Sequence, residues 1–175
     1  TLISQAFAIW QAKLGNRTVC LMPPVLVGQF FDAFNETFLG IGKLVDIQMY
    51  RGTAAQRQAL INKWNAGKWP DIVIMSYDAF REEGVVFGDY SCLIMDEAKV
   101  MGNADNIVYD KIEQFMGEYG QKYGIVMNGT PAKNNLADLY GYIRFTSPWI
   151  YPSELNFQLR HVRFKKINVR VKDDK

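Results

Sequence analysis

The stretch Leu93-Ile94-Met95-Asp96-Glu97-Ala98-Lys99 decides the fold of this chain, because three apolar residues run directly into two adjacent carboxylates. Such an apolar run predicts a buried strand of a parallel sheet. Acids at its carboxyl end lie where open α/β sheets bind ligands. Because strand side chains alternate in direction, we expect Asp96 and Glu97 to point to opposite sides. One acid could then hold Mg²⁺ through water while the other reaches a water molecule that attacks a phosphate. The pair alone is also compatible with two surface acids at a strand end.

Five apolar segments alternate with helical patterns along the chain. The strands are expected at residues 18–22, 45–50, 71–75, 91–95 and 123–127. This alternation predicts βαβ units, and therefore an α/β fold with a doubly wound, mainly parallel sheet and helices on both faces. Residues 84–90 are expected to form a loop. The pattern weakens after Pro148, and residues 157–171 are compatible with a strand, a loop or an edge hairpin.

Composition indicates one globular domain with a core, since the 175 residues are 49% hydrophobic and 14% aromatic. The 20 Lys and Arg residues exceed the 18 Asp and Glu residues only slightly, so the net charge of +2 does not by itself indicate nucleic-acid binding. The positive charge is uneven, because the segment 160–170 contains no acid and has the basic residues Arg160, Arg163, Lys165, Lys166 and Arg170. This run predicts either a nonspecific phosphate-binding patch or a solvated face.

The remaining residue types exclude several classes of site. Cys20 and Cys92 lie in apolar runs and are predicted to be reduced core thiols of an intracellular protein, cytoplasmic in a bacterium or phage and nuclear in a eukaryote. The single histidine, His161, excludes a His-rich metal site and a His-based triad near the acids. No apolar stretch is long enough to span a membrane, so no membrane partner is expected. A helical pattern begins at Thr1 without an initiator Met, so we expect the native protein to continue upstream.

Turn-forming and polar residues follow the predicted strands. Apart from the two acids, they are Pro23, Pro24, Arg51, Gly52, Ser76, Tyr77, Asn128, Gly129, Thr130 and Pro131. Because the carboxyl ends of parallel strands meet at one edge, these residues are expected to lie on the same side of the sheet. Each motif has a simpler explanation, since Pro-Pro and Gly-Thr-Pro are common in turns and Ser76 could cap a helix. Five such motifs in this order favour a functional edge.

In this order the motifs resemble those of the first ATPase lobe of helicase superfamily two, most closely the Swi/Snf-type branch of DNA translocases. The resemblance covers nearly all of residues 1–160, and Asp96-Glu97-Ala98-Lys99 stands where the family has its DEAD or DEAH box. The other matching segments are Leu21-Met22-Pro23-Pro24 with Gln29-Phe30, Tyr50-Arg51-Gly52 with Arg57, residues 71–77, Gly129-Thr130-Pro131 with Asn134, Asp138-Leu139-Tyr140, and Pro148. The resemblance implies a truncated RecA-like P-loop NTPase lobe over residues 1–148, followed by a basic C-terminal extension over residues 149–175.

The resemblance also implies cofactors, partners and residue roles. ATP and Mg²⁺ are the expected cofactors, held by Thr1 and Asp96, and Glu97 is expected to orient and deprotonate the attacking water. Expected partners are DNA, single- or double-stranded, or RNA, together with a second ATPase lobe of the same parent protein. The nucleotide state would be coupled to the nucleic acid through Gly129, Thr130 and Pro131. Backbone contacts to nucleic acid are expected from Pro23, Pro24, Arg51, Gly52, Ser76 and Tyr77.

Two departures from the family pattern leave alternatives open. Lys99 replaces the usual His or Asp at the end of the box, and the Gly-Lys phosphate loop that would precede Thr1 is absent. We therefore expect the 175-residue chain alone to hydrolyse no ATP. One alternative is a degenerate lobe that binds nucleic acid or a protein partner without turnover. Another is an unrelated doubly wound domain that binds a mononucleotide or a phospho-signal.

Overall fold

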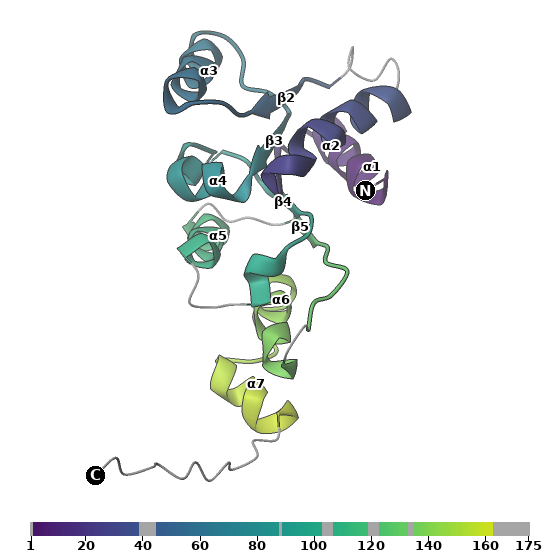
Figure 1. Cartoon of the computed structure of the whole chain (residues 1–175), viewed down its shortest axis with the longest axis vertical. Helices are drawn as coiled ribbons and strands as arrows, with labels where there is room; N and C mark the ends of the chain where they lie inside the picture. Colours follow the sequence, from purple (N-terminus) through teal and green to yellow (C-terminus); the bar gives the residue numbers. More distant parts are fainter. Residues whose placement is uncertain are drawn as a thin grey trace, which may run out of the picture.

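The five described strands form one parallel sheet with helices on both faces, which confirms the predicted α/β fold (Figure 1). The computed structural model describes residues 2–38, 45–87, 89–102, 107–118, 123–132 and 135–162. The strands are β1 Thr18–Met22, β2 Ile47–Tyr50, β3 Ile72–Ser76, β4 Cys92–Met95 and β5 Tyr123–Val126. Their order in the sheet is β2-β3-β1-β4-β5. The chain therefore passes from central β1 to the edge strand β2, returns to β3 beside β1, and then crosses to β4 and β5 on the other side.

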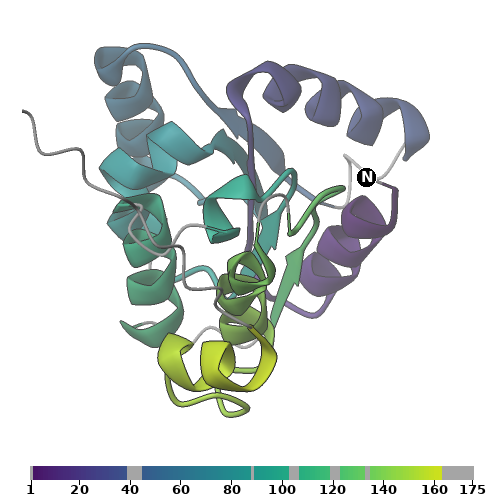
Figure 2. The same ribbon diagram turned by 60° about the horizontal axis from the view of Figure 1, so that its bottom comes forward.

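The first two helices of the chain cover one face of this sheet, and the next three cover the other face. On one face lie α1 Leu2–Lys13 and α2 Pro24–Thr37, and on the other lie α3 Ala54–Ala66, α4 Tyr77–Glu83 and α5 Ile107–Glu118 (Figures 1 and 2). Strand residues alternate between the two layers: Val19 and Leu21 pack beneath α3 to α5, whereas Cys20 and Met22 pack beneath α1 and α2. Burial on both faces explains why the strands are continuous apolar runs.

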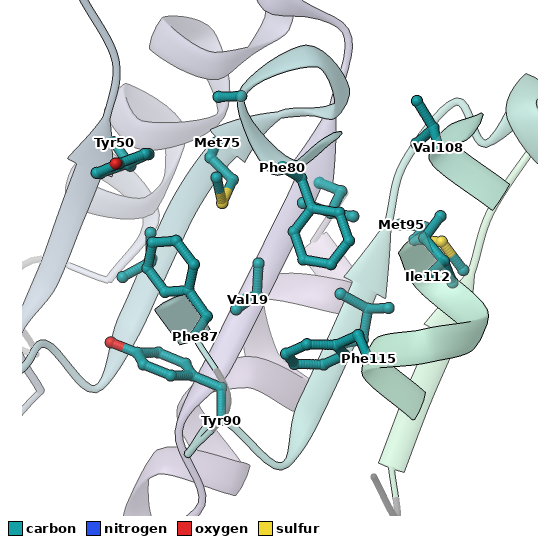
Figure 3. Packing of buried hydrophobic residues seen from close by; sticks show 14 of the residues in the cluster. Val19, Tyr50, Met75, Phe80, Phe87, Tyr90, Met95, Val108, Ile112 and Phe115 are labelled. Atoms are coloured by element: carbon teal, nitrogen blue, oxygen red, sulfur yellow. The ribbon is translucent and has the colours of Figure 1, made fainter. Parts of the chain in front are cut away.

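The layer beneath α3 to α5 contains an aromatic cluster that corrects one prediction (Figure 3). Residues expected to form a loop instead include a 3₁₀ helix, η2 Gly84–Phe87. Phe87 is fully buried, with its ring centroid 5.3 Å from that of Tyr50 and 6.4 Å from that of Trp64. Tyr90 packs against Phe87 at 5.5 Å. Burial of these two rings holds the segment against the core and gives it regular structure.

The C-terminal third differs most from what the sequence predicts. The 3₁₀ segment η4 Leu136–Asp138 precedes the helices α6 Leu139–Thr146 and α7 Glu154–His161. An earlier 3₁₀ segment, η3 Lys99–Gly102, follows the acids after β4. No helix was expected at residues 157–161. The α7 helix begins where the Ser153 hydroxyl accepts a hydrogen bond from the Asn156 amide at 3.3 Å. It is anchored by Phe157, whose ring lies 6.0 Å from that of Tyr140 on α6. Residues 163–171 of the undecided segment lie outside the described residues.

Other expectations can be checked against the described residues. Cys20 and Cys92 are buried free thiols, as predicted, and burial raises the pKa of Cys92 to about 11. No helix in the described part of the chain is long and apolar enough to cross a membrane. Within those same residues, no group of three His, Cys, Asp or Glu side chains could hold a metal ion.

Candidate functional site

All five strands end at the same level of the sheet. Tyr50, Met75, Leu21, Met95 and Val126 form one continuous row of paired residues from β2 to β5. The residues one step further along each strand are Arg51, Ser76, Met22, Asp96 and Met127. The register therefore brings the predicted strand-end motifs to one edge, which is where open parallel sheets bind their ligands.

The two acids differ in backbone conformation, which corrects the argument from strand alternation. Strand β4 ends at Met95, before either acid. The Asp96 amide still donates a hydrogen bond to the Leu21 carbonyl of β1 at 2.8 Å. The Glu97 backbone is no longer extended, because its φ is +50°. The Asp96 carboxylate accepts a hydrogen bond from the Glu97 backbone amide at 3.0 Å. The two acids are therefore separated by a tight turn, which we call the acidic turn (residues 96–98), and not by the pleat of a strand.

The left-handed conformation of Glu97 is unusual for a residue with a Cβ atom. Such outliers persist where the surroundings hold them and are frequent at functional sites. The Glu97 carboxylate is partly exposed, and its Oε2 lies 3.6 Å from Nζ of Lys99. The residue that departs from the family pattern thus places a cation beside the acid expected to activate water.

The turn 128–131 after β5 is joined to the acidic turn by Asn128, one of the predicted strand-end residues, and by Tyr142, which the sequence did not indicate. The Tyr142 hydroxyl, on α6, donates to the Ala98 carbonyl at 2.8 Å and accepts a hydrogen bond from the Asn128 amide group. The Asn128 side-chain oxygen in turn accepts the Thr130 amide at 3.1 Å. Gly129, Thr130 and Pro131 are themselves exposed.

Ser76 and Tyr77 lie where β3 ends and α4 begins. The Ser76 hydroxyl accepts the Ala79 amide at 3.2 Å, so Ser76 caps α4, as its simpler explanation predicts. The Tyr77 hydroxyl donates to the Asp96 carbonyl at 2.8 Å. Burial, and secondarily the nearby Asp96 charge, raises the pKa of Tyr77 well above its ordinary value. The tyrosine therefore keeps its proton and remains a donor to the acidic turn.

The ends of β1, β2 and β3 enclose an open hollow of about 230 Å³. It brings together four of the residues expected to contact nucleic acid, Pro24, Arg51, Gly52 and Ser76. Pro23 is adjacent, as the residue before α2. Gly52 has a φ of +111°, and an added Cβ would lie 2.4 Å from Oε1 of Gln56, so this turn requires glycine.

Arg57 also lines the hollow, but its guanidinium is already paired with two carboxylates of the protein. Its Nε lies 2.8 Å from Glu83, another guanidinium nitrogen lies 2.6 Å from Glu82, and a third donates to the Gly52 carbonyl at 2.9 Å. Arg51 forms no salt bridge within the described part of the chain. Arg51 is therefore the cation of the hollow that is available to a ligand.

Several predicted residues cannot be placed. Thr1, Asn134 and the basic residues from Arg163 onward lie outside the described residues, while Arg160 lies in the last turn of α7. The chemistry of the donor set can still be compared with what Mg²⁺ requires. Mg²⁺ keeps several waters and binds through one or two carboxylates together with nucleotide phosphates. Asp96, a carboxylate at the sheet edge without a salt bridge among the described residues, fits that requirement.

Known proteins resemble this chain in sequence. The model of the SNF2-related domain matches residues 11–170. TATA-binding protein-associated factor BTAF1 of Arabidopsis thaliana is 26% identical over 144 residues, which is 81% of this chain and 7% of that protein. The RAD54-like DNA repair and recombination protein of Drosophila erecta is 24% identical over 138 residues, which is 76% of this chain and 17% of that protein. The chain thus spans a small part of the relatives it matches.

A solved structure shares the fold. It is the SWI2/SNF2 ATPase core of Sulfolobus solfataricus in complex with dsDNA, with a TM-score of 0.62 and 16% identity, covering 90% of this chain and 30% of that one. The five-stranded parallel sheet is therefore that of a RecA-like lobe. Because the family model matches most of the sequence, the chain belongs to the SNF2-related domain family, in the Swi/Snf branch of helicase superfamily two.

Proposed function

We propose that this chain is the first ATPase lobe of an ATP-dependent DNA translocase, with residues 1–148 as the lobe and residues 149–175 as its basic extension. The observation that supports this most is the common level of the strand ends. It puts the acidic turn after β4 beside the hollow formed by β1, β2 and β3. A nucleotide site and a nucleic-acid site would thus share one rigid edge, an arrangement suited to coupling hydrolysis to movement.

The two acids have separate roles in this proposal. Mg²⁺-ATP, when bound, supplies the phosphoryl group and neutralises its charge. Asp96 would hold the metal, with Thr1 as the second proposed ligand. Glu97 accepts a proton from the attacking water at its carboxylate. Its contact with Lys99 must first open, which costs little because the Lys99 side chain is largely exposed and that of Glu97 is partly exposed.

The hollow is the proposed contact with the DNA backbone. The N-termini of α2 and α3 follow β1 and β2 at the carboxyl ends of the strands, and helix N-termini favour phosphate groups. Arg51 adds a full positive charge. Contacts of this kind hold the phosphates without selecting a base sequence, which suits a protein that moves along DNA. Gly129, Thr130 and Pro131 would transmit the nucleotide state to this grip, and a second lobe would complete the site.

A degenerate lobe without turnover is the second candidate. The observation that favours it is Lys99, whose ammonium group lies 3.6 Å from the proposed base. In that case the edge would bind nucleic acid or a protein partner, and neither acid would affect the rate of any reaction.

Steady-state ATPase assays on the complete parent protein, with and without DNA, test the proposal beside fluorescence measurements of nucleotide binding. Glu97→Gln should lower turnover roughly 10²–10⁴-fold, as expected for loss of a general base, and leave nucleotide binding intact. Asp96→Asn should weaken Mg²⁺-nucleotide binding as well. Thr130→Ala should keep basal hydrolysis and remove its stimulation by DNA. Glu36→Gln, on the exposed surface of α2, is the control and should change none of these.

Two outcomes would contradict the proposal. Near-normal DNA-stimulated turnover in Glu97→Gln would show that the base is elsewhere. No turnover in the unaltered parent protein, with nucleic-acid binding retained, would favour the degenerate lobe.

A further inference from the structure

Two tyrosine hydroxyls donate hydrogen bonds to the backbone of the acidic turn. Tyr77 donates to the carbonyl of Asp96 at 2.8 Å, and Tyr142 donates to the carbonyl of Ala98 at 2.8 Å. These carbonyls belong to the residues immediately before and after Glu97. The Glu97 side chain is thus carried on a backbone segment that is fixed at both ends by a phenol.

Each of these tyrosines is connected to a different functional segment. Tyr77 is the first residue of α4 and directly follows Ser76, which lines the hollow. Tyr142 belongs to α6, and its hydroxyl is hydrogen-bonded to Asn128, whose side chain holds the Thr130 amide. The acidic turn is therefore linked on one side to the proposed DNA contact and on the other to the turn 128–131.

We propose that Tyr77 and Tyr142 are positioning residues that keep Glu97 in its left-handed conformation, and that Asn128 connects the turn 128–131 to Glu97 through Tyr142. The effect of this arrangement on turnover rests on the proposed function, whereas its effect on the backbone does not.

The conformation of Glu97 explains why such support is needed. A left-handed backbone is unfavourable for a residue with a Cβ atom, so the acidic turn would relax without external bonds. Ala98 is fully buried, so its carbonyl would lose its phenol donor where water cannot easily replace it. Relaxation at Glu97 would rotate its carboxylate, and a general base acts only from a defined position.

Hydrogen exchange of the amides of residues 97–99, measured on the complete parent protein by mass spectrometry, tests the proposal. Tyr142→Phe and Tyr77→Phe each remove one hydroxyl and keep the ring. Exchange in this segment should become roughly 2- to 10-fold faster, the factor that corresponds to one lost hydrogen bond. Tyr90→Phe is the matched control, because the buried Tyr90 hydroxyl also donates to a backbone carbonyl, that of Pro70, at 2.7 Å. Pro70 and Tyr90 precede β3 and β4, so they lie at the amino ends of the strands, whereas the acidic turn lies at the carboxyl ends.

A double-mutant cycle tests the connection through Asn128. If Asn128 acts through Tyr142, Asn128→Ala should accelerate exchange at residues 97–99 in the unaltered background and add almost nothing to Tyr142→Phe. Combined with Tyr90→Phe, it should have its full effect. Independent effects of Asn128→Ala and Tyr142→Phe would overturn the connection.

A kinetic measurement separates this inference from the proposed function. Tyr142→Phe should lower the DNA-stimulated kcat roughly 10-fold and leave the KM for nucleotide unchanged, because it displaces the base and not the binding site. Faster exchange in the variants of a protein that shows no turnover would support the positioning role and contradict the translocase. Exchange at residues 97–99 equal to that of Tyr90→Phe would overturn the positioning role, whatever the turnover.

Discussion

Arg51 and Arg57 belong to the same matching segment of sequence, yet their surroundings separate them. Arg57 is bound by two carboxylates and a backbone carbonyl, and its side chain is only 13% exposed. The exposed Arg51 guanidinium lies along α2, 3.7 Å from where a Cβ on Gly28 would be. One arginine therefore stabilises the lobe, and the other is available for a phosphate.

Replacing Arg51 should weaken DNA binding without unfolding the protein. Arg51→Gln removes one phosphate contact, so the slope of log affinity against log salt should become shallower by about 0.9, with similar losses for different DNA sequences. Lys63→Gln removes a positive charge from the exposed face of α3 outside the hollow, and it should leave the slope unchanged. Equal slopes for both variants in a fluorescence anisotropy titration would exclude Arg51 from the interface.

The residues of the site differ in how far the sequence could predict them. Asp96 and Glu97 were predictable because an apolar strand ends directly before them, and the strand-end motifs followed from the same argument. The positive φ of Glu97 was not predictable, since glutamate has no preference for that conformation. Tyr142 was missed because its contact with Ala98 joins segments far apart in sequence.

Among the elements, α6 shows how closely the C-terminal helices approach the acidic turn. An added Cβ at Gly141 would lie 2.0 Å from the carbonyl oxygen of Met101 at the end of η3, a contact with backbone that a side-chain rotation cannot relieve. Glycine at this position lets α6 pack directly on η3. That packing places Tyr142, the next residue, beside Ala98.

Two alanine substitutions in helices should therefore have opposite effects. Gly141→Ala should lower the free energy of unfolding by about 1–3 kcal/mol or more, as expected for overpacking. Gly117→Ala, in α5, meets nothing within 4 Å, and it should raise the free energy by up to about 1 kcal/mol, because alanine is the better helix former. Urea denaturation followed by circular dichroism measures both. A neutral Gly141→Ala would show that α6 and η3 are further apart than described.

The elements that sequence did not predict are those formed by tertiary contacts. In α7, Leu155 and Leu159 are exposed while Phe157 is buried, so the apolar residues do not form one stripe facing the core. Ser153 before Glu154 was the available signal of a helix start. The η2 segment is too short for periodicity and depends on burial of Phe87. The five strands, in contrast, were recognisable because each is apolar and bounded by turn residues.

At the scale of the whole molecule, the class of the sheet was predictable and its strand order was not. Alternating strands and helices allow several right-handed parallel arrangements. The observed order β2-β3-β1-β4-β5 puts β1 and β4 side by side, which allows the Asp96 amide to bond to Leu21. The same order puts β4 between β1 and β5, so the acidic turn lies next to the ends of both strands.

The stability of the whole lobe should depend on pH through Glu83, which ties α4 to β2 and α3. Its carboxylate accepts hydrogen bonds from the hydroxyl of Tyr50 and the guanidinium of Arg57. Burial alone would raise the pKa of Glu83, but these two partners bring it below its ordinary value of 4.5. A carboxylate whose pKa is lower in the folded state stabilises the protein fully above the unfolded pKa. That contribution is lost as the pH falls through the folded pKa.

Urea unfolding between about pH 6 and about pH 3 should reveal this contribution. In the unaltered chain, the free energy of unfolding should decrease as the pH falls below about 4.5. Glu83→Gln should be less stable at neutral pH by about 1–3 kcal/mol, the value of hydrogen bonds to a charged group, and its stability should change less with pH.

Glu82→Gln is the matched control, because Glu82 also contacts Arg57, at 2.6 Å, but is half exposed, and an exposed pair contributes little. It should follow the pH dependence of the unaltered chain. If the curves for Glu83→Gln and the unaltered chain were parallel, other carboxylates would have to account for the loss of stability in acid. The contact of α4 with β2 and α3 would then be stabilised by the buried rings of Tyr50, Trp64 and Phe87 and not by the ion pair of Glu83 with Arg57.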